Sequence, residues 1–276
     1  MLLGAWLVGQ YEPDSWAAEL VKRRYRAAFF PVGSEAADEL VDAYVKAAAS
    51  SGIVIAETGA WSNPLSSDRA TRRAALEHCK AELALADRVG AKCCVNISGS
   101  RGAKWDGPDA ANLTDETFDM IVETTREIID AVKPRRTFYT LEPMPWMYPD
   151  STGSYMRLIR AIDRKAFAVH FDPVNMISSI DAYFHNDKLI RDFLTTLFPY
   201  VKSCHAKDIA LADTLTVHLG EVRPGEGNLS YRTYLSELSK LPADTPLMFE
   251  HLKTNEEFDL AAAYVRGVAS ELQIPL

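Results

Sequence analysis

The sequence of 276 residues lacks the features of membrane and secreted proteins. No apolar run approaches the roughly 18 residues of a membrane span. The apolar run near the amino terminus has no basic residues before it and is too short for the core of a signal peptide. Cysteine is scarce as well, since there are four and none lies in a CxxC pair. We therefore interpret the cysteines as reduced packing residues and expect a cytoplasmic protein.

Basic residues are outnumbered by acidic ones. The chain has 30 Lys and Arg residues and 38 Asp and Glu residues, which gives a net charge of −8. Nucleic-acid binding needs clustered Lys and Arg for phosphate contacts, so the composition argues against it. A GxGxxG fingerprint and any other phosphate-cradling glycine loop are missing too. We therefore expect an unphosphorylated small-molecule partner, no nucleic acid and no membrane.

Short runs of apolar, β-branched or aromatic residues alternate with longer amphipathic stretches along the chain. The runs predict eight strands, which end near Val8, Pro31, Glu57, Asn96, Glu142, Asp172, His205 and Glu250. The amphipathic stretches predict helices over Glu35–Ser50, Ser67–Val89, Leu113–Val132, Tyr155–Asp163, Asp181–Leu197, Tyr231–Leu238 and Glu256–Leu272. Strands that alternate with helices form parallel βαβ units, and eight units of roughly 34 residues suit one closed barrel. We predict an α/β fold with a single (β/α)8 TIM barrel domain over residues 1–276, and a doubly wound sheet is the alternative.

The helix predicted over Ser67–Val89 carries the clearest local signals. Its apolar residues recur at helical spacing and predict a buried stripe of Ala74, Ala81, Leu85 and Val89. Ser67 and Thr114 are placed to cap the starts of two helices, and Gly90 is placed to end the first of them.

Four successive predicted strands each end in a polar residue that can bind a metal ion, namely Glu142, Asp172, His205 and Glu250. Active sites of α/β barrels lie at the C-terminal ends of the strands, so we expect these side chains to converge. Three converging carboxylates repel one another unless a cation lies between them. A helix cap or an ion pair explains one such residue more easily than four in succession. Oxygen ligands with one imidazole suit a hard or borderline divalent metal, so we expect Mn²⁺ first, with Mg²⁺ or Co²⁺ as alternatives.

The segments LEPMPW, HFDPVN, SCHAKD, PGEG and FEHL resemble the xylose-isomerase-like barrel superfamily, and the resemblance covers essentially the whole chain. That superfamily includes sugar isomerases and epimerases, dehydratases and endonuclease IV. The resemblance implies that Glu142, Asp172, His205 and Glu250 are the metal ligands. It also implies that Glu142 and Glu250 are the catalytic acid/base pair.

The expected reaction follows from a metal that chelates a carbonyl and a neighbouring hydroxyl and thereby makes the adjacent C–H acidic. One glutamate removes a proton to give a metal-bound enediolate, and a proton then returns to the opposite face or to the neighbouring carbon. We predict a divalent-metal-dependent sugar isomerase or epimerase that acts on an unphosphorylated keto-sugar, polyol or sugar acid. The alternative is a metal-dependent lyase that eliminates water or an aglycone from an oxidised, 3-keto sugar or glycoside. A metal-stabilised, non-catalytic sugar-binding subunit is a third hypothesis.

Three positions depart from the ketose 3-epimerases of that superfamily. Asn175, Tyr148 and Leu211 stand where those enzymes carry a His, a carboxylate and an Arg. The hexulose-recognition set is therefore incomplete, which keeps the lyase alternative open. We expect a carbohydrate substrate as partner and leave open a homo-oligomer or association with a second subunit.

Three further polar residues are candidates for substrate binding. His170 and Lys207 each lie two positions from a predicted metal ligand, so their side chains share its face of the strand. Glu57 closes the third predicted strand and is placed to bind substrate or to orient a loop. A hydrogen-bonded core histidine is the alternative for His170, and an ion pair with a site glutamate is the alternative for Lys207. Strand alternation predicts that His251, next to a ligand, faces away from the site.

Aromatic and loop residues complete the set of substrate-binding candidates. Trp61, Trp146 and Phe171 are placed to form sugar-stacking walls, although core packing is the alternative for at least one of them. Arg223 lies in RPGEG, within the longest irregular stretch, Ala210–Ser230, and long loops of this kind are often active-site elements. Its guanidinium is placed to clamp a phosphate or carboxylate, and a solvated surface arginine is the alternative.

Overall fold

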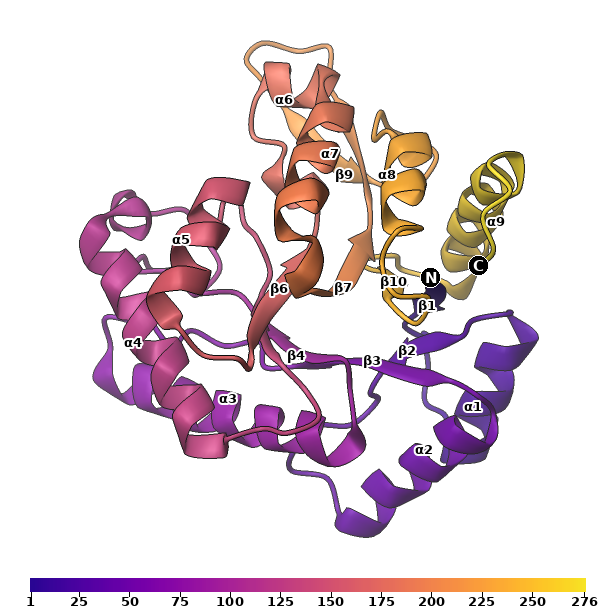
Figure 1. Ribbon diagram of the computed structural model, residues 1–276, viewed down its shortest axis with the longest axis horizontal. Helices are drawn as coiled ribbons and strands as arrows, with labels where there is room; N and C mark the ends of the chain where they lie inside the picture. The colour runs from indigo at the N-terminus through magenta and orange to yellow at the C-terminus, as the bar shows by residue number, and fades with distance from the viewer.

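The computed structural model describes residues 1–276 and shows eight parallel strands closed into a barrel, with helices outside it (Figure 1). The barrel strands are β1 Leu2–Ala5, β2 Ala27–Phe29, β3 Val54–Gly59, β4 Cys93–Asn96, β5 Tyr139–Leu141, β6 Phe167–Phe171, β7 Val201–Ala206 and β10 Pro246–Phe249. They follow one another around the ring in chain order, and β1 pairs with β10. The (β/α)8 prediction is confirmed, and the doubly wound alternative is wrong because the sheet has no open edge.

The helices are α1 Pro13–Lys22, α2 Asp38–Ser50, α3 Arg69–Val89, α4 Asp115–Val132, α5 Thr152–Ile162, α6 Ile180–Phe184, α7 Asn186–Leu197, α8 Tyr231–Leu238 and α9 Asn255–Glu271. All seven predicted helical regions are present. The region predicted as one helix over Asp181–Leu197 is two helices, which meet at His185. Helix α1 was not predicted, although Pro13 at its first position and Asp14 in its first turn are standard start signals.

Helix α3 lies where it is predicted but buries a different face. Leu85 and Val89 are buried as predicted, whereas Ala74 and Ala81 are exposed. The buried stripe runs through Ala75, Cys79, Leu83 and Ala86. Alanine occurs on both faces of this helix, so its small side chain does not identify the face that packs against the barrel.

The ends of the long helices follow local side-chain chemistry. Thr114 caps α4 as predicted, because its side chain accepts the backbone N–H of Thr117. The cap of α3 is Asp68 rather than the predicted Ser67, and its carboxylate accepts the N–H of Thr71 at 2.7 Å. Gly90 ends α3 in the left-handed region with φ of 72°, as predicted.

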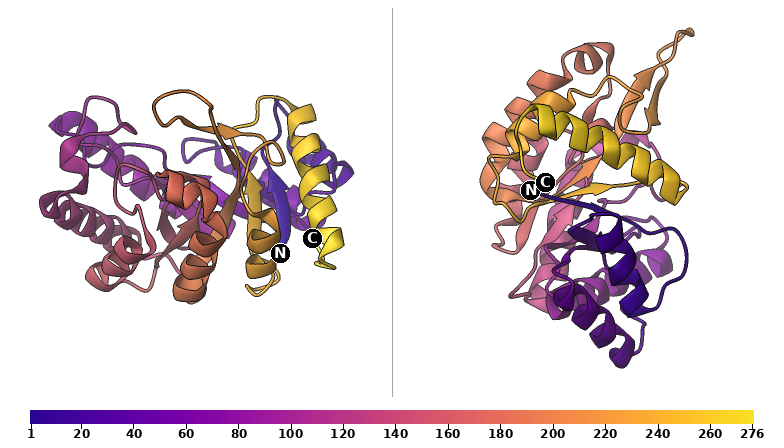
Figure 2. Two further views of the ribbon diagram at one scale, coloured as in Figure 1. Left: turned by 90° about the horizontal axis from the view of Figure 1, so that it is seen from above. Right: turned by 90° about the vertical axis from the view of Figure 1, so that its right-hand side faces the viewer.

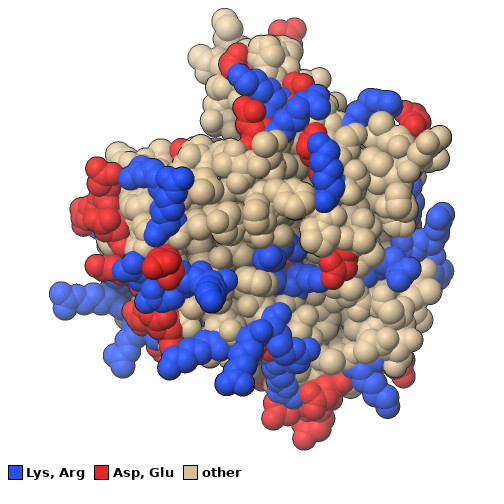
Figure 3. Space-filling model, viewed as in Figure 1, with Lys and Arg blue, Asp and Glu red and all other residues tan.

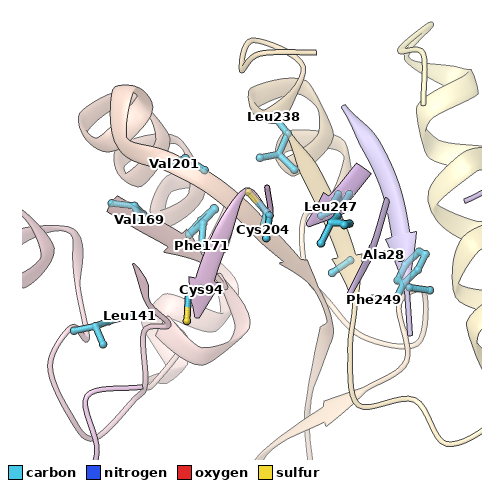
Figure 4. Packing of buried hydrophobic residues seen from close by; sticks show 14 of the residues in the cluster. Ala28, Cys94, Leu141, Val169, Phe171, Val201, Cys204, Leu238, Leu247 and Phe249 are labelled. Carbon is cyan, nitrogen blue, oxygen red and sulfur yellow. The ribbon is translucent and has the colours of Figure 1, made fainter. Parts of the chain in front are cut away.

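The main hydrophobic core lies between the barrel and the helices, and Figure 4 shows part of it. Strand residues that face outward pack against the helices. Phe171 of β6, for example, stacks on Phe193 of α7 with ring centroids 4.0 Å apart. Phe171 is therefore core packing, and its predicted role as a sugar-stacking wall is wrong. All four cysteines are free and buried, as expected of packing residues.

The inside of the barrel is narrow and only partly apolar. Ala27, Ala56 and Met248 form a small cluster separate from the main core. Gly4 is needed beside them, because a Cβ at this position would lie 2.4 Å from the Met248 Sδ atom. Other buried residues that face inward are polar and include Thr140, His170, Ser203 and His205. The barrel therefore carries buried polar groups beneath its C-terminal mouth.

The stretch Ala210–Ser230 is more ordered than its sequence indicates. β8 Asp208–Leu211 and β9 Leu219–Val222 form an antiparallel hairpin, which projects beyond the barrel in the right-hand view of Figure 2. The Asp208 carboxylate then fixes the following loop by accepting the backbone N–H groups of Gly225, Gly227 and Leu229 at 2.8–3.1 Å. The expectation of an irregular stretch is therefore wrong for the hairpin, whose strands of four residues are too short to show clear alternation.

On the face shown in Figure 3, Lys and Arg side chains are interspersed with Asp and Glu side chains. Among the ion pairs of the molecule, Arg164, which follows α5, pairs with Asp130 of α4 at an N···O distance of 2.6 Å. Exposed pairs of this kind each contribute little to stability. None of the helices has the length and apolar composition that a membrane crossing requires.

Candidate metal centre

Four ligand-type side chains meet at the mouth of the barrel. Glu142 follows β5, Asp172 follows β6, His205 lies in β7 and Glu250 follows β10. These strands are neighbours in the ring, so their C-terminal ends deliver the four side chains to one place. One ligand atom from each residue lies within 4.8 Å of those of the other three. The structure thus brings together the four residues that the strand ends single out.

His205 presents a different partner to each ring nitrogen. Its Nδ1 atom lies 3.1 Å from Glu250 Oε2, 3.3 Å from Glu142 Oε1 and 3.7 Å from Asp172 Oδ2. Its Nε2 atom lies 3.4 Å from Glu57 Oε2 on the opposite side of the ring. Burial by itself lowers the pKa of His205, but the charges of Glu250, Glu142 and Glu57 raise it well above its ordinary value.

The carboxylates are oriented by groups around them. Asp172 Oδ1 accepts the backbone N–H groups of Val174 at 2.9 Å and Asn175 at 3.2 Å, which leaves Oδ2 facing the cluster. The Asn175 side chain donates from Nδ2 to Glu142 Oε1 at 2.9 Å. Asn175, which stands where the ketose 3-epimerases carry a His, is therefore part of the site.

The ammonium group of Lys207 lies against the same carboxylates. Its Nζ atom is 2.6 Å from Glu250 Oε2, 2.8 Å from Asp172 Oδ2 and 3.4 Å from Glu142 Oε1. Burial lowers the pKa of Lys207, but the three negative charges raise it well above its ordinary value. Burial raises the pKa of Asp172 and Glu250, and the nearby cations of Lys207 and His205 bring both values far below the usual range. The ion pair considered for Lys207 is therefore present.

The donor set fits a divalent metal ion. Asp172 Oδ2 and Glu250 Oε2 are buried and accept no hydrogen bond of normal geometry, so each has a lone pair available for a ligand bond. The three carboxylates, the Lys207 ammonium and one dication balance in charge when His205 is neutral. Oxygen atoms with one imidazole nitrogen match the preferences of Mn²⁺ and Mg²⁺ better than those of thiolate-seeking metals.

Glu57 and His170 lie beneath this cluster rather than facing the solvent. Glu57 Oε1 lies 3.2 Å from His170 Nε2 and also accepts a hydrogen bond from Ser203, and neither the Glu57 nor the His170 side chain has exposed surface. The two histidine rings, His170 and His205, are 4.1 Å apart at their centroids. A carboxylate that receives the second N–H of a ligand histidine orients that ring, which suits Glu57 for positioning rather than for substrate contact.

A cavity of about 430 Å³ opens over the cluster, and we call it the polar cavity because the charged side chains of the cluster line it. Its lining includes Glu142, Glu250 and Lys207 from the cluster, together with Asn175 and Trp105. This volume lies within the usual range for small-molecule sites. The cluster is therefore accessible to a ligand the size of a sugar.

Trp146 and Arg223, like Glu57 and His170, do not line this cavity. Trp146 donates its indole N–H to the carbonyl of Asp106 at 2.8 Å and so supports a cavity wall from behind. Arg223 pairs with Glu226 at 2.6 Å within its own loop. The structure brings neither side chain to the ligand cluster.

The orientation predicted for His251 is wrong. β10 ends at Phe249, and His251 has a left-handed backbone with φ of 59°, so strand alternation no longer applies to it. Its ring lines the polar cavity and lies 3.0 Å from Glu221 Oε2 of the hairpin. His251 thus connects the hairpin to the mouth of the barrel.

Trp105 and Asp106 line the cavity, and neither was predicted as a site residue. They lie in the long segment between β4 and α4, which follows a strand at its C-terminal end. Loops in that position carry the active sites of α/β barrels. The length of this segment was therefore the feature of the sequence that could have indicated Trp105 and Asp106 as site residues.

Comparison with known proteins agrees with this architecture. Residues 17–269 match the family model described as a xylose isomerase-like TIM barrel. No curated protein matches the chain by sequence. Among solved structures, D-psicose 3-epimerase of Clostridium cellulolyticum H10 superposes with a TM-score of 0.70 at 14% identity, over 97% of this chain and 99% of the other.

Two more solved structures show the same fold at low identity. The probable 3-DHS dehydratase AsbF of Bacillus anthracis has a TM-score of 0.74 at 15% identity, over 98% of this chain and 99% of the other. A xylose isomerase-like TIM barrel protein of Mycobacterium smegmatis, in complex with magnesium, has a TM-score of 0.66 at 14% identity, over 98% and 96% of the two chains. Because the family model spans most of the sequence, this chain belongs to the xylose isomerase-like TIM barrel family.

Proposed function

We propose that the protein is a divalent-metal-dependent isomerase or epimerase of an unphosphorylated keto-sugar, polyol or sugar acid. The observation that carries the proposal is the placement of Glu142 and Glu250. They come from β5 and β10, on either side of the strands that bear Asp172 and His205, and both line the same cavity. Two carboxylates arranged in this way can exchange protons with a substrate held between them.

Asp172, His205, Glu142 and Glu250 would hold the ion, with manganese as our first choice and magnesium or cobalt as alternatives. A bound divalent ion acts as a Lewis acid that makes the C–H next to a substrate carbonyl acidic. Glu57 Oε2 lies 3.4 Å from His205 Nε2, and Asn175 donates a hydrogen bond to the Glu142 carboxylate. The hydrogen bond from Asn175 limits the motion of Glu142, one of the two groups that transfer protons.

In the proposed reaction, one of the two glutamates removes a proton from the carbon beside the carbonyl. The substrate enediolate is then protonated on its other face, which gives an epimer, or on the neighbouring carbon, which gives an isomer. The Lys207 ammonium lies beside both glutamates and stabilises negative charge that develops on the substrate oxygens.

The charges in the cavity support a substrate without phosphate. Lys207 is the one lysine or arginine that lines the polar cavity, and its ammonium is already paired with three carboxylates. Arg223, the other cation considered for anion binding, is paired with Glu226. Hydroxyl groups, by contrast, find both donors and acceptors in Asn175, Asp106 and the glutamates.

Solvent deuterium exchange tests the proposal. The Mn²⁺-loaded protein is incubated with keto-sugars, polyols and sugar acids in D₂O, and exchange of a carbon-bound hydrogen is followed by NMR and mass spectrometry. An isomerase or epimerase incorporates deuterium into a product that has lost no group, whereas a lyase releases water or an aglycone. We expect Glu142→Gln and Glu250→Gln each to lower the rate at least ~10²-fold. Near-normal turnover in either variant contradicts the role of that glutamate, and the absence of exchange with the whole panel contradicts the proposed reaction.

A further inference from the structure

A second cavity, of about 460 Å³, adjoins the polar cavity at the mouth of the barrel. The two cavities share Trp61, Glu250 and His251 in their linings. The second cavity extends over the ends of β1, β2 and β3, whereas the polar cavity lies over β5, β6 and β7. Glu250 therefore lies at the junction of two compartments of similar size.

The second compartment is aromatic. Trp6 and Trp61 line it and remain 45% and 40% exposed, which is unusual for such large apolar side chains. Phe29 lies between Trp6 and the metal cluster, with its ring centroid 6.5 Å from that of Trp6 and 6.1 Å from that of His205. A row of aromatic rings thus leads from the rim to a predicted metal ligand. We name this compartment, lined by Trp6, Phe29 and Trp61, the aromatic subsite.

Local contacts support the walls of the aromatic subsite. The Trp61 indole lies so close to Gly59 that a Cβ at this position would be 2.3 Å from Nε1. On the other side, the buried Glu82 carboxylate accepts the backbone N–H of Ser34 at 2.8 Å and so ties the segment after β2 to α3. The glycine and the buried carboxylate therefore support both sides of the opening.

Charge restricts what the aromatic subsite can bind. No lysine or arginine lines it, and its ionisable groups are Glu57, Glu82, Glu250 and His251. Phosphate or carboxylate groups would find no lysine or arginine there and would face acidic side chains, and the His251 ring is already paired with Glu221. An uncharged planar group, in contrast, can stack on the exposed indoles and remove their apolar surface from water.

We propose that the substrate has two parts: a sugar that occupies the polar cavity beside Glu142 and Lys207, and an uncharged aromatic group, joined to that sugar, that occupies the aromatic subsite. The substrate class is therefore an aryl glycoside, or a closely related aryl-substituted sugar, whose sugar part carries the keto group that the proposed reaction requires. This inference rests on the proposed function for the position of the sugar. The shared position of Glu250 supports it, because a bond between the two parts would cross the junction of the compartments.

Matched pairs of glycosides test the proposal by direct binding. Calorimetry with the Mn²⁺-loaded protein compares 4-nitrophenyl and methyl glycosides of glucose, galactose and xylose, which lack a keto group and therefore report binding without reaction. For at least one sugar, we expect the aryl member to bind at least about tenfold more tightly than the methyl member. Equal affinity within every pair, or no binding of any member, would overturn the proposal.

Two tryptophan variants locate the contact. Trp6→Ala should reduce the aryl affinity to the level of the methyl glycoside and leave the methyl affinity unchanged. Trp105→Ala is the matched control. Trp105 is also 40% exposed, but it lines the polar cavity and does not line the aromatic subsite. This variant should weaken both members of a pair equally. Loss of the aryl preference in Trp105→Ala but not in Trp6→Ala contradicts the assignment.

The outcomes separate this inference from the proposed reaction and from a protein occupant. An aryl preference without deuterium exchange contradicts the reaction and leaves the subsite supported. Exchange with free keto-sugars but no aryl preference contradicts the subsite alone. Light scattering tests whether a second copy of the chain occupies the subsite. In that case the wild-type protein is a dimer that dissociates in Trp6→Ala, while the affinity for the aryl glycoside is unaffected. That result would show that a second copy of the chain occupies the subsite, and it would overturn the proposal.

Discussion

At the level of single residues, the candidate metal centre contains one permanent cation, the Lys207 ammonium, beside a site suited to a divalent metal ion. The Lys207 ammonium lies within 3.4 Å of an oxygen of Glu142, Asp172 and Glu250. Without a metal ion, Lys207 and a protonated His205 are the cations that offset these three charges. With a dication bound and His205 neutral, the same residues are balanced. Lys207 therefore stabilises the metal-free site and also opposes binding of the ion.

Replacement of Lys207 by methionine should therefore strengthen metal binding. We expect Lys207→Met to lower the Kd for Mn²⁺ at least about tenfold, because the removed charge lies close to every carboxylate ligand. Calorimetric titration of the purified protein measures the change. Lys202→Met is the control, because Lys202 lies over the ring of Phe138, away from the ligands. Weaker binding in Lys207→Met would mean that the ammonium holds the ligands in place rather than repelling the ion.

Metal binding should also depend on pH through His205. The nearby glutamates keep the pKa of His205 well above its ordinary value despite burial, so the ring is protonated in the metal-free protein near pH 7. The ion binds the neutral ring, so binding releases a proton and becomes tighter as pH rises toward that pKa, by up to about tenfold per pH unit. Titrations with Mn²⁺ at pH 6, 7 and 8, in buffers of different ionisation heat, measure both quantities. An affinity that is constant over this range would show that His205 is already neutral.

At the level of elements, the residues that could be predicted from the sequence lie where strands begin and end. Apolar runs that alternate with helical patterns locate the strands, so the sequence alone places Glu142, Asp172, His205 and Glu250 at one mouth of the barrel. Residues outside regular elements could not be placed in this way. His251 faces the site because of its positive φ, which the strand pattern does not encode.

The face of a helix and the fold of a loop were harder to predict for a different reason. Ala74 and Ala81 are too small to distinguish a buried from an exposed face of α3. The loop after the hairpin depends on Asp208, which accepts three backbone N–H groups that lie 17 to 21 residues later in the chain. Local periodicity contains no information about contacts at that separation.

The Asp208 clamp should make a measurable contribution to stability. We expect Asp208→Ala to lower the free energy of unfolding by about 3 kcal/mol, because the N–H groups of Gly225, Gly227 and Leu229 lose a charged acceptor. Urea denaturation of the metal-free protein measures the change. Asp213→Ala in the exposed turn of the hairpin is the matched control and should have little effect. Equal stability of the two variants would show that the loop contributes nothing to the fold.

At the level of the whole molecule, the four candidate metal ligands all lie on one half of the barrel. They come from β5, β6, β7 and β10, which are consecutive around the ring. The aromatic subsite covers the other half, over β1, β2 and β3. Strand order therefore determines both compartments, and the closure of β1 on β10 places them side by side. A bound ion would connect four strand ends through their side chains, in addition to the backbone pairing of the strands.

Metal should therefore raise the unfolding temperature of the entire chain. An ion at about 100 times its Kd stabilises the folded state by about 2.7 kcal/mol. For a domain of this size, that free energy corresponds to an increase in Tm of about 5–10 °C. Thermal unfolding followed by circular dichroism, with Mn²⁺ and with chelator, measures the shift. His205→Ala should abolish the shift, because one of the four ligands is lost, whereas His185→Ala, which removes an exposed histidine between α6 and α7, should retain it. An equal Tm with and without metal would mean that the four strand ends do not form a metal site, and the proposed chemistry would lose its basis.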